Sequence, residues 1–247
     1  MEGGSLHEFL HRRTASSSPL TAEAQHSIAL DVARGLTYLH SLGWMHRDVK
    51  PSNVLLDSAT PPRAKVGDFG LSTRIGFEAH VATVGTHCYM APEVYFQAYS
   101  TRADVYAFGI LLWELIYAER PFQSYREQGK VALVVAITMH DRRPELRSGA
   151  VAVPCGYARV ASACWATDVG KRPGMAQVVV WLQCLEGSPI GPPQMEVRIE
   201  EACESTFHSA AAPAMNQSLM SVPGFEHHTS KLGAAEFAED HFIGVGG

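Results

Sequence analysis

Three short segments hold the residues whose types and spacing could do chemistry. They are residues 46–53 (HRDVKPSN), residues 68–70 (DFG), which begin fifteen positions after Asn53, and residues 85–93 (GTHCYMAPE). Each segment alone is weak evidence, because a tripeptide such as DFG occurs often by chance. The joint order and spacing of the segments, rather than any one of them, carries the information.

The three segments resemble, in this order, the catalytic loop, the metal-binding triplet and the Ala-Pro-Glu motif of the eukaryotic protein kinases. Phosphoryl transfer depends on positioning and charge neutralisation more than on covalent chemistry. The resemblance implies that Asp48 orients the substrate hydroxyl and accepts its proton, while Lys50 lies against the transferring phosphate. It also implies that Asn53 and Asp68 hold two Mg²⁺ ions, and that Leu55 lies beneath the adenine ring of ATP.

Residues 68–93 resemble the activation loop of that family. Arg47 would pair with a phosphate on this segment, since a guanidinium binds phosphate through two parallel hydrogen bonds. Thr86 would belong to the substrate-binding part and contact Asp48 and Lys50. The sequence leaves open which hydroxyl is phosphorylated. The candidates are Ser72, Thr73 and Thr83.

The resemblance implies structural roles for His46, Phe69, Gly70, Glu93, Asp104 and Arg172. Glu93 would form a buried ion pair with Arg172. Asp104, which opens an apolar segment, would hold the backbone of the catalytic loop. A histidine in such a loop invites interpretation as a metal ligand or a general base. The family pattern instead implies that His46 packs beneath Phe69.

The spacing of Lys50, two residues after Asp48, is typical of serine/threonine specificity within this family. Residues 1–6 and 104–110 are similar to the tyrosine-kinase-like group. The implied function is transfer of the γ-phosphate of ATP to a protein serine or threonine hydroxyl. The alternative is a kinase-derived module that binds partners without catalysis. A site that lost its activity long ago should have lost at least one of Asp48, Asn53 and Asp68. All three remain, which favours the enzyme.

Short helices and a hairpin should position these segments. Ser5 and Glu8 form a capping box, so a helix is expected to begin there. Residues Ile28, Val32, Leu36 and Leu39 recur at helical spacing, which predicts a helix from about Thr21 to Gly43 with one buried face. The runs 54–56 and 64–66 flank a turn with two prolines and predict a small hairpin near the catalytic loop.

The rest of the expected architecture is helical. Residues 101–117 are apolar with no polar face, which indicates a fully buried central helix. Further helices are expected over 126–140, 157–166 and 174–186. The predicted fold class is therefore mainly α, with one small hairpin.

The resemblance covers residues 1–187 and only the C-terminal lobe of the family. The β-rich N-terminal lobe, with its Gly-rich loop, strand lysine and helix glutamate, does not precede Asp48, so we expect little or no activity from this chain by itself. Residues 188–232 are rich in proline and small residues and are interpreted as a disordered linker. Residues 233–247 resemble the approach to the Gly-rich loop of a second kinase domain; the other interpretation is a flexible tail.

Composition excludes several classes of protein. The 247 residues carry a net charge of −5, so no basic surface indicates nucleic acid or anionic lipid. No run approaches the ~18 apolar residues of a membrane span. Five cysteines without CxxC spacing favour reduced thiols in a cytoplasmic protein. Cys88 near the substrate groove could be a redox sensor or, more commonly, a small half-buried residue. The oligomeric state stays open.

Overall fold

The computed structural model describes residues 3–11, 21–76, 87–147 and 155–185, all of them in the first of the chain's two units, residues 1–199. The predicted linker 188–232 and the predicted second domain or tail 233–247 lie outside the described residues. So do two of the candidate site residues, Thr83 and Thr86.

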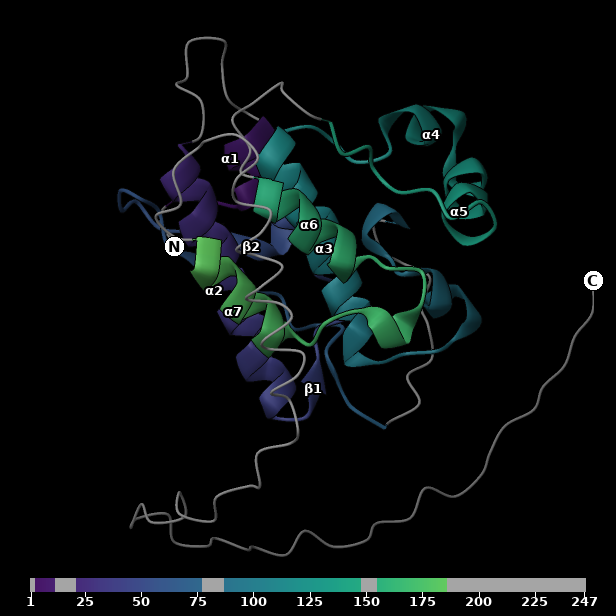
Figure 1. Cartoon of the computed structure of the whole chain (residues 1–247), viewed down its shortest axis with the longest axis horizontal. Coiled ribbons are helices and arrows are strands. Elements are labelled where there is room, and N and C mark those ends of the chain that lie inside the picture. The colour runs from purple at the N-terminus through teal and green to yellow at the C-terminus, as the bar shows by residue number, and fades with distance from the viewer. Residues whose placement is uncertain (1–2, 12–20, 77–86, 148–154, 186–247) are drawn as a thin grey trace, which may run out of the picture. The chain divides into compact units, whose positions relative to one another are not determined.

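The described part is mainly helical with short strands, as the sequence predicts (Figure 1). Its helices are α1 (Leu6–His11), α2 (Ala22–Ser41), α3 (Thr101–Tyr117), α4 (Gln123–Gln128), α5 (Lys130–Thr138), α6 (Cys155–Cys164) and α7 (Met175–Leu185). Its 3-10 helices are η1 (Pro51–Asn53), η2 (His87–Tyr89), η3 (Pro92–Phe96) and η4 (Val169–Lys171). Its strands are β1 (Trp44–Met45), β2 (Val54–Leu56), β3 (Ala64–Val66) and β4 (Thr73–Arg74).

The helix termini follow from local chemistry. The predicted capping box is present before α1, where Ser5 Oγ accepts from the Glu8 amide at 3.2 Å and the Glu8 carboxylate accepts from the Ser5 amide at 3.1 Å. Thr21 caps α2 through its hydroxyl, which accepts from the amide of residue 24. Gly43 follows the end of α2 with φ +77, a conformation that glycine adopts without steric cost. The chain can therefore turn sharply from α2 into β1.

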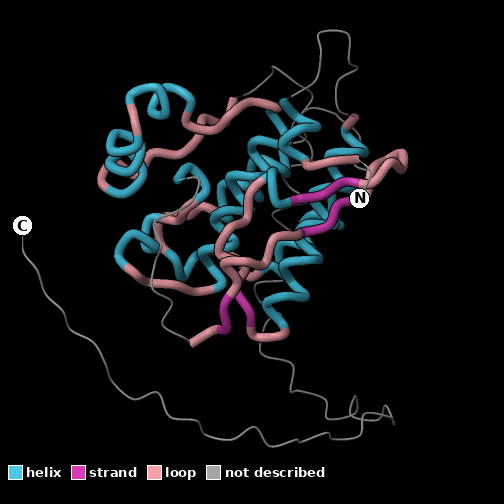
Figure 2. The backbone as a smooth tube through the Cα atoms, turned by 180° about the vertical axis from the view of Figure 1, so that it is seen from behind, coloured by secondary structure: helices cyan, strands magenta, loops and turns pink. Residues whose placement is uncertain are grey.

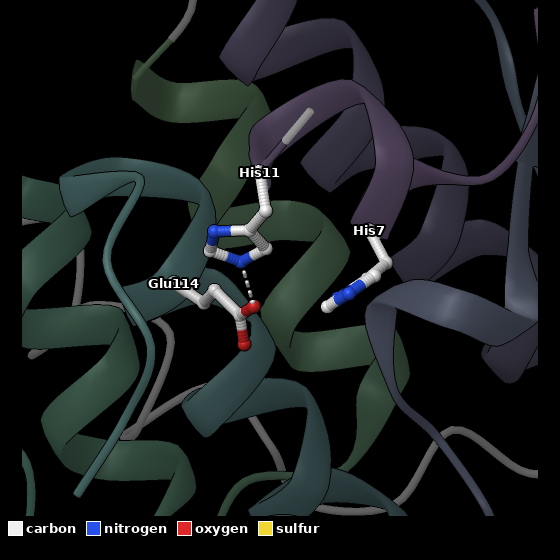
Figure 3. A group of neighbouring side chains, drawn as sticks. All are labelled: His7, His11 and Glu114. Atoms are coloured by element: carbon white, nitrogen blue, oxygen red, sulfur yellow. Dashed lines mark hydrogen bonds and ion pairs between the residues drawn. The ribbon is translucent and has the colours of Figure 1, made fainter. Parts of the chain in front are cut away.

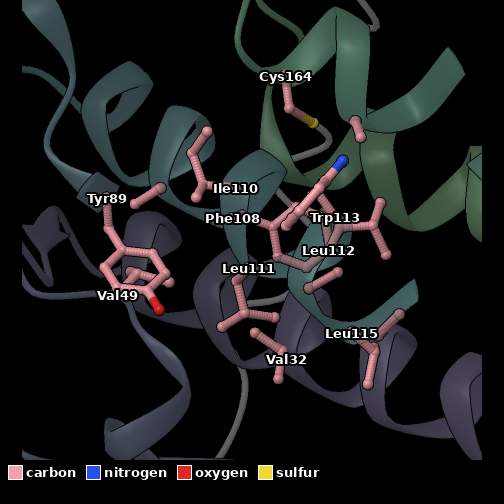
Figure 4. Packing of buried hydrophobic residues seen from close by; sticks show 14 of the residues in the cluster. Val32, Val49, Tyr89, Phe108, Ile110, Leu111, Leu112, Trp113, Leu115 and Cys164 are labelled. Carbon is pink, nitrogen blue, oxygen red and sulfur yellow. The ribbon is translucent and has the colours of Figure 1, made fainter. Parts of the chain in front are cut away.

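The central helix α3 is buried from Asp104 to Tyr117, which confirms the prediction made from its missing polar face. It packs against α2 and α6, while α7 packs along α2 (Figure 1). Figure 4 shows the α3 side chains at the centre of the core, with Val32 of α2 on one side and Cys164 of α6 on the other. Gly109 permits the close approach of α6, because a Cβ there would lie 2.9 Å from the Cβ of Cys164.

The predicted hairpin is present as β2 and β3, which pair antiparallel with Val54 opposite Val66. Residues 3–5 run alongside β2: Gly3 donates to Leu56 O at 3.1 Å, and Leu56 donates to Gly4 O at 2.9 Å. A second pair, β1 with β4, lies at the other end of the described part (Figure 2). This second pair could not be predicted from the sequence, because two-residue strands carry no periodicity.

Two helix predictions were wrong in detail. The single helix expected over 126–140 is two helices, α4 and α5, separated at Gly129, whose φ of +103 ends the first helix. Leu39 was expected on the buried face of α2; it lies in the last turn and is only partly buried, whereas Ile28, Val32 and Leu36 are fully buried. Among the described residues, no helix combines the length and apolar character that a bilayer crossing requires.

Candidate active site

One carboxylate binds the backbone of the loop formed by residues 46–53. Asp104, 1% exposed at the start of α3, accepts from the His46 amide through Oδ2 and from the Arg47 amide through Oδ1, both at 2.8 Å. Oδ2 also contacts His40 Nε2 at 2.8 Å. Arg47 has φ +68, a conformation that costs a non-glycine residue energy and persists where surrounding contacts fix it. The buried helix thus fixes the backbone from which the catalytic candidates extend.

Asp48, Lys50 and Asn53 meet in one hydrogen-bonded group. Lys50 Nζ donates to Asp48 Oδ2 at 2.6 Å, and Asn53 Nδ2 donates to the same oxygen at 2.8 Å. Asn53 Nδ2 also donates to the Asp48 carbonyl at 2.9 Å, which fixes its amide with the nitrogen inward. The side chains of Asp48 and Lys50 keep 15% and 19% of their surface exposed, so a ligand can reach them. The group combines a carboxylate and an ammonium at the protein surface.

The hairpin brings Asp68 to this group. Asn53 immediately precedes β2 and Asp68 follows β3 by two residues, and antiparallel pairing puts these two ends side by side. Gly67 N donates to Asn53 O at 2.8 Å, and Gly67 O lies 3.0 Å from His46 Nε2. Asp68 itself has φ +59, and its Oδ1 accepts from the Gly70 amide at 3.3 Å. Carboxylate and amide groups that flank the two strands therefore lie at the same, open end of the hairpin, a donor set that suits Mg²⁺.

His46 takes the structural position that the sequence analysis expected. Its side chain is fully buried, its Nε2 contacts the Gly67 carbonyl, and its ring centroid lies 5.3 Å from that of Phe69 at a tilt of 55°. Phe69 is itself 54% exposed on its other side. The histidine joins the loop to residues 67–69, and within the described part of the chain it belongs to no cluster of metal-ligating side chains.

Leu55 stands apart from its neighbours in β2. Val54 and Leu56 are 1% exposed and face the core, whereas Leu55 points the other way with 38% of its surface exposed. Its backbone bridges Ser5, and a Cβ built at Gly67 would lie 3.6 Å from Leu55 Cδ1. An apolar surface next to the Asp48 group, flanked by residues 3–5, is where an aromatic ring could rest.

The start of the predicted activation loop is ordered by β1. Thr73 pairs with Met45 across β1 and β4, and Ser72 Oγ donates to His46 O at 3.4 Å. Arg47 reaches the same region, where its guanidinium lies 4.5 Å from the ring centroid of Tyr99 and Nη1 contacts Leu71 O at 3.5 Å. Among the described residues, Arg47 Nε has no hydrogen-bond partner. The structure therefore places the Arg47 guanidinium against the carbonyl of Leu71, which immediately precedes the candidate phosphorylation sites Ser72 and Thr73.

Glu93 and Arg172 form the ion pair that the sequence analysis expected. Arg172 Nη1 and Nη2 donate to Glu93 Oε1 and Oε2 at 2.6 and 2.9 Å, and the arginine side chain has no exposed surface. Arg172 also donates to the carbonyls of Ala166 and Arg102, at 2.8 and 3.1 Å. This pair ties the end of the 85–93 segment to α3 and to the residues before α7.

Cys88 is 1% exposed, not half-buried, and burial raises the pKa of its thiol to about 12. A thiol with so high a pKa is unreactive at neutral pH, since the thiolate is the nucleophile. The structure therefore disfavours the redox-sensor interpretation. Cys88, Cys164 and Cys184 are free thiols.

Sequence reasoning missed two polar residues with long-range partners, of which His40 supports the site through Asp104. His40 contacts Asp104 from the last turn of α2, and Glu114 lies inside α3 with 1% exposure, bound by Tyr89 and His11. Glu114 could have been found, because a carboxylate within an apolar helix must have a partner. His40 gave no such signal.

Comparison with known proteins agrees with this geometry. Residues 1–181 match the sequence model of a family described as the protein kinase domain. The chain is 36% identical over 191 residues to the probable serine/threonine-protein kinase drkC of Dictyostelium discoideum, covering 74% of this chain and 24% of that protein. It is 35% identical over 197 residues to the serine/threonine/tyrosine-protein kinase HT1 of Arabidopsis thaliana, covering 77% and 48%.

A third relative is the serine/threonine-protein kinase VIK of Arabidopsis thaliana, 35% identical over 192 residues that cover 74% of this chain and 42% of that protein. The chain spans less than half the length of each of these relatives.

Proposed function

The chain belongs to the protein kinase family, and we propose that it supplies the catalytic loop and metal ligands of a serine/threonine kinase that phosphorylates protein substrates with ATP. The observation that carries the proposal is the group in which Lys50 and Asn53 both donate to Asp48 Oδ2, with Asp68 brought to the same edge by the hairpin. The names of the relatives, together with the position of Lys50, support the serine/threonine assignment.

Each residue has a task in the proposed reaction. The substrate hydroxyl attacks the γ-phosphorus, the bond from phosphorus to the leaving oxygen of ADP breaks, and the hydroxyl proton passes to the Asp48 carboxylate. Lys50 neutralises charge on the transferring group. Asn53, whose nitrogen donates to Asp48, would offer its oxygen, and with Asp68 it would hold Mg²⁺, which neutralises the phosphate oxygens. Leu55 would support the adenine ring.

The test is a kinase assay on the intact protein. Asp48→Asn should lower Mg²⁺-dependent transfer from ATP by about 10²–10⁴-fold, because the proton acceptor is lost. Asp168→Asn is the matched control: Asp168 is exposed and caps η4, and asparagine caps equally well, so activity should be unchanged. Transfer that survives Asp48→Asn would overturn the assignment of Asp48.

Nucleotide binding distinguishes the enzyme from the alternative, a kinase-derived interaction module. An enzyme should show a rise in melting temperature with Mg·ATP that Asp68→Asn removes, because Asp68 is a proposed metal ligand. A module that only binds partners should show no such rise in melting temperature, in the parent or in Asp68→Asn.

A further part of the proposal concerns regulation. A phosphate on Ser72, Thr73 or Thr83 would pair with Arg47, whose position beside Leu71 and Tyr99 supports this. Alanine at the site that is used should lower activity to the level of Arg47→Ala, and the double variant should fall no further. Additive losses would argue against the pairing.

The finer assignments rest on the sequence. We infer that residues 1–187 correspond to a C-terminal lobe, that the protein belongs to the tyrosine-kinase-like group, and that it is cytoplasmic. Residues 188–232 would be a linker, and 233–247 the start of a second kinase domain or, as the alternative, a flexible tail. Sequencing the full transcript across both ends tests the lobe and domain assignments: a Gly-rich loop and strand lysine upstream, and kinase motifs downstream, are the expected result.

A further inference from the structure

Two histidines and a glutamate gather on the side of α3 that faces α1. His7 and His11 lie four residues apart on α1, so they share one face of the helix. Glu114 reaches the same point from α3 (Figure 3). One ligand atom from each residue lies within 4.8 Å of the other two. None of the three belongs to the proposed active site.

The carboxylate of Glu114 is set in an environment that favours a bound cation. Its side chain is 1% exposed, and His11 Nε2 lies 2.6 Å from Oε1. Oε2 accepts from the hydroxyl of Tyr89. Burial of a carboxylate costs free energy unless the group is paired. The second oxygen of Glu114, Oε2, is already oriented by Tyr89, which is not one of the metal-ligand candidates.

We propose that His7, His11 and Glu114 form a binding site for a divalent transition-metal ion such as Zn²⁺, with water completing the coordination. Two imidazole nitrogens and one carboxylate oxygen are a set that zinc accepts. Zinc bonds of about 2.0–2.2 Å in tetrahedral geometry place neighbouring ligand atoms about 3.3 Å apart. The contact between His11 and Glu114 would therefore widen slightly, and the metal would replace the hydrogen that these two atoms share.

The donor set distinguishes this site from the proposed nucleotide site. Imidazole suits zinc and its neighbours, whereas Mg²⁺ prefers oxygen ligands and keeps several waters. Asn53 and Asp68 therefore suit Mg²⁺, and the histidine site should ignore it. A zinc ion bound here would join α1 to the buried helix α3, and the proposal does not depend on kinase activity.

The test is a titration of the intact protein with Zn²⁺ by calorimetry, in saturating Mg²⁺ so that the oxygen ligands are occupied. The parent should bind one Zn²⁺ at this site. His7→Ala should weaken this binding by at least about 100-fold, because loss of even an outer partner of a metal site costs about 10–100-fold. His140→Ala, at an exposed histidine, and Asp68→Asn are the controls and should leave the affinity unchanged.

Folding of His7→Ala is checked by circular dichroism with a chelator present, where it should match the parent. His7→Gln, which keeps a polar side chain, provides a second variant with the same expected loss. X-ray absorption of the zinc-bound parent should show two imidazole ligands, falling to one in His7→Gln. Zinc affinity that is absent in the parent, equal in parent and both His7 variants, or removed by a control variant would overturn the proposal.

Discussion

Removal of the Glu93 charge should destabilise the protein strongly. Glu93→Gln leaves the guanidinium of Arg172, with no exposed surface, facing a neutral amide. Breaking a buried ion pair in this way costs about 3–5 kcal/mol. The lower end applies here, because glutamine keeps one acceptor oxygen and Arg172 keeps its bonds to the carbonyls of Ala166 and Arg102. We therefore expect a loss of about 3 kcal/mol.

The chain contains a matched control of the same chemistry. Arg147 and Glu119 are 2.7 Å apart, but their side chains are 36% and 54% exposed. An exposed pair contributes at most about 1 kcal/mol, so Glu119→Gln should have little effect. In a protein of this size, 1 kcal/mol corresponds to about 2–4 °C in melting temperature, so Glu93→Gln should melt about 6–12 °C below the parent.

Urea unfolding of the two variants and the parent measures the effect. The double variant Glu93→Gln/Arg172→Met should recover part of the loss, because it removes the unpaired buried charge as well. The reasoning is refuted if Glu93→Gln loses no more free energy of unfolding than Glu119→Gln. The same conclusion follows if Arg172→Met lowers the free energy of unfolding of Glu93→Gln by as much as it lowers that of the parent, because the two substitutions would then act independently.

Asp104→Asn should speed hydrogen exchange at the two loop amides that this carboxylate binds, because an amide offers one acceptor oxygen where the carboxylate offers two; unchanged exchange would contradict this. Cys88, with its pKa raised to about 12 by burial, should react with iodoacetamide at pH 8 far more slowly than exposed Cys184, and the gap should narrow only as the pH nears 12. Equal labelling by mass spectrometry would refute the burial argument. Gly109→Ala should lower the free energy of unfolding in urea by about 1–3 kcal/mol, because its new methyl group would meet Cys164; no loss would mean that α3 and α6 can separate without cost.

The sequence predicted those parts of the fold whose cause is local. The capping box at Ser5 is a contact between residues three apart, and the burial of 101–117 follows from the absence of a polar face. The hairpin was predictable because turn residues separate its two strands. The break at Gly129 was not, since an isolated glycine is tolerated within helices and only its left-handed φ reveals the end.

The candidate site was predictable for a different reason. Asp48, Lys50 and Asn53 were found because they match a family motif, not because any physical pattern in the sequence joins them. Their common contact at Asp48 Oδ2 depends on the loop conformation that Asp104 fixes. Contacts between residues far apart in the chain, such as that of His11 with Glu114, leave no trace in a single sequence beyond an unexpected charge in an apolar run.

The β2–β3 hairpin has a consequence for how this region can vary. Asn53 and Asp68 lie at the open end of the hairpin, and the connection of residues 57–63 lies at the other. That connection is closed by its own contacts, with Asp57 Oδ1 accepting from the amides of Ala59 and Arg63. Insertions there would lengthen a surface loop without shifting the register of Val54 and Val66. The length of the connection can therefore change while the distance between the two proposed metal ligands, Asn53 and Asp68, stays constant.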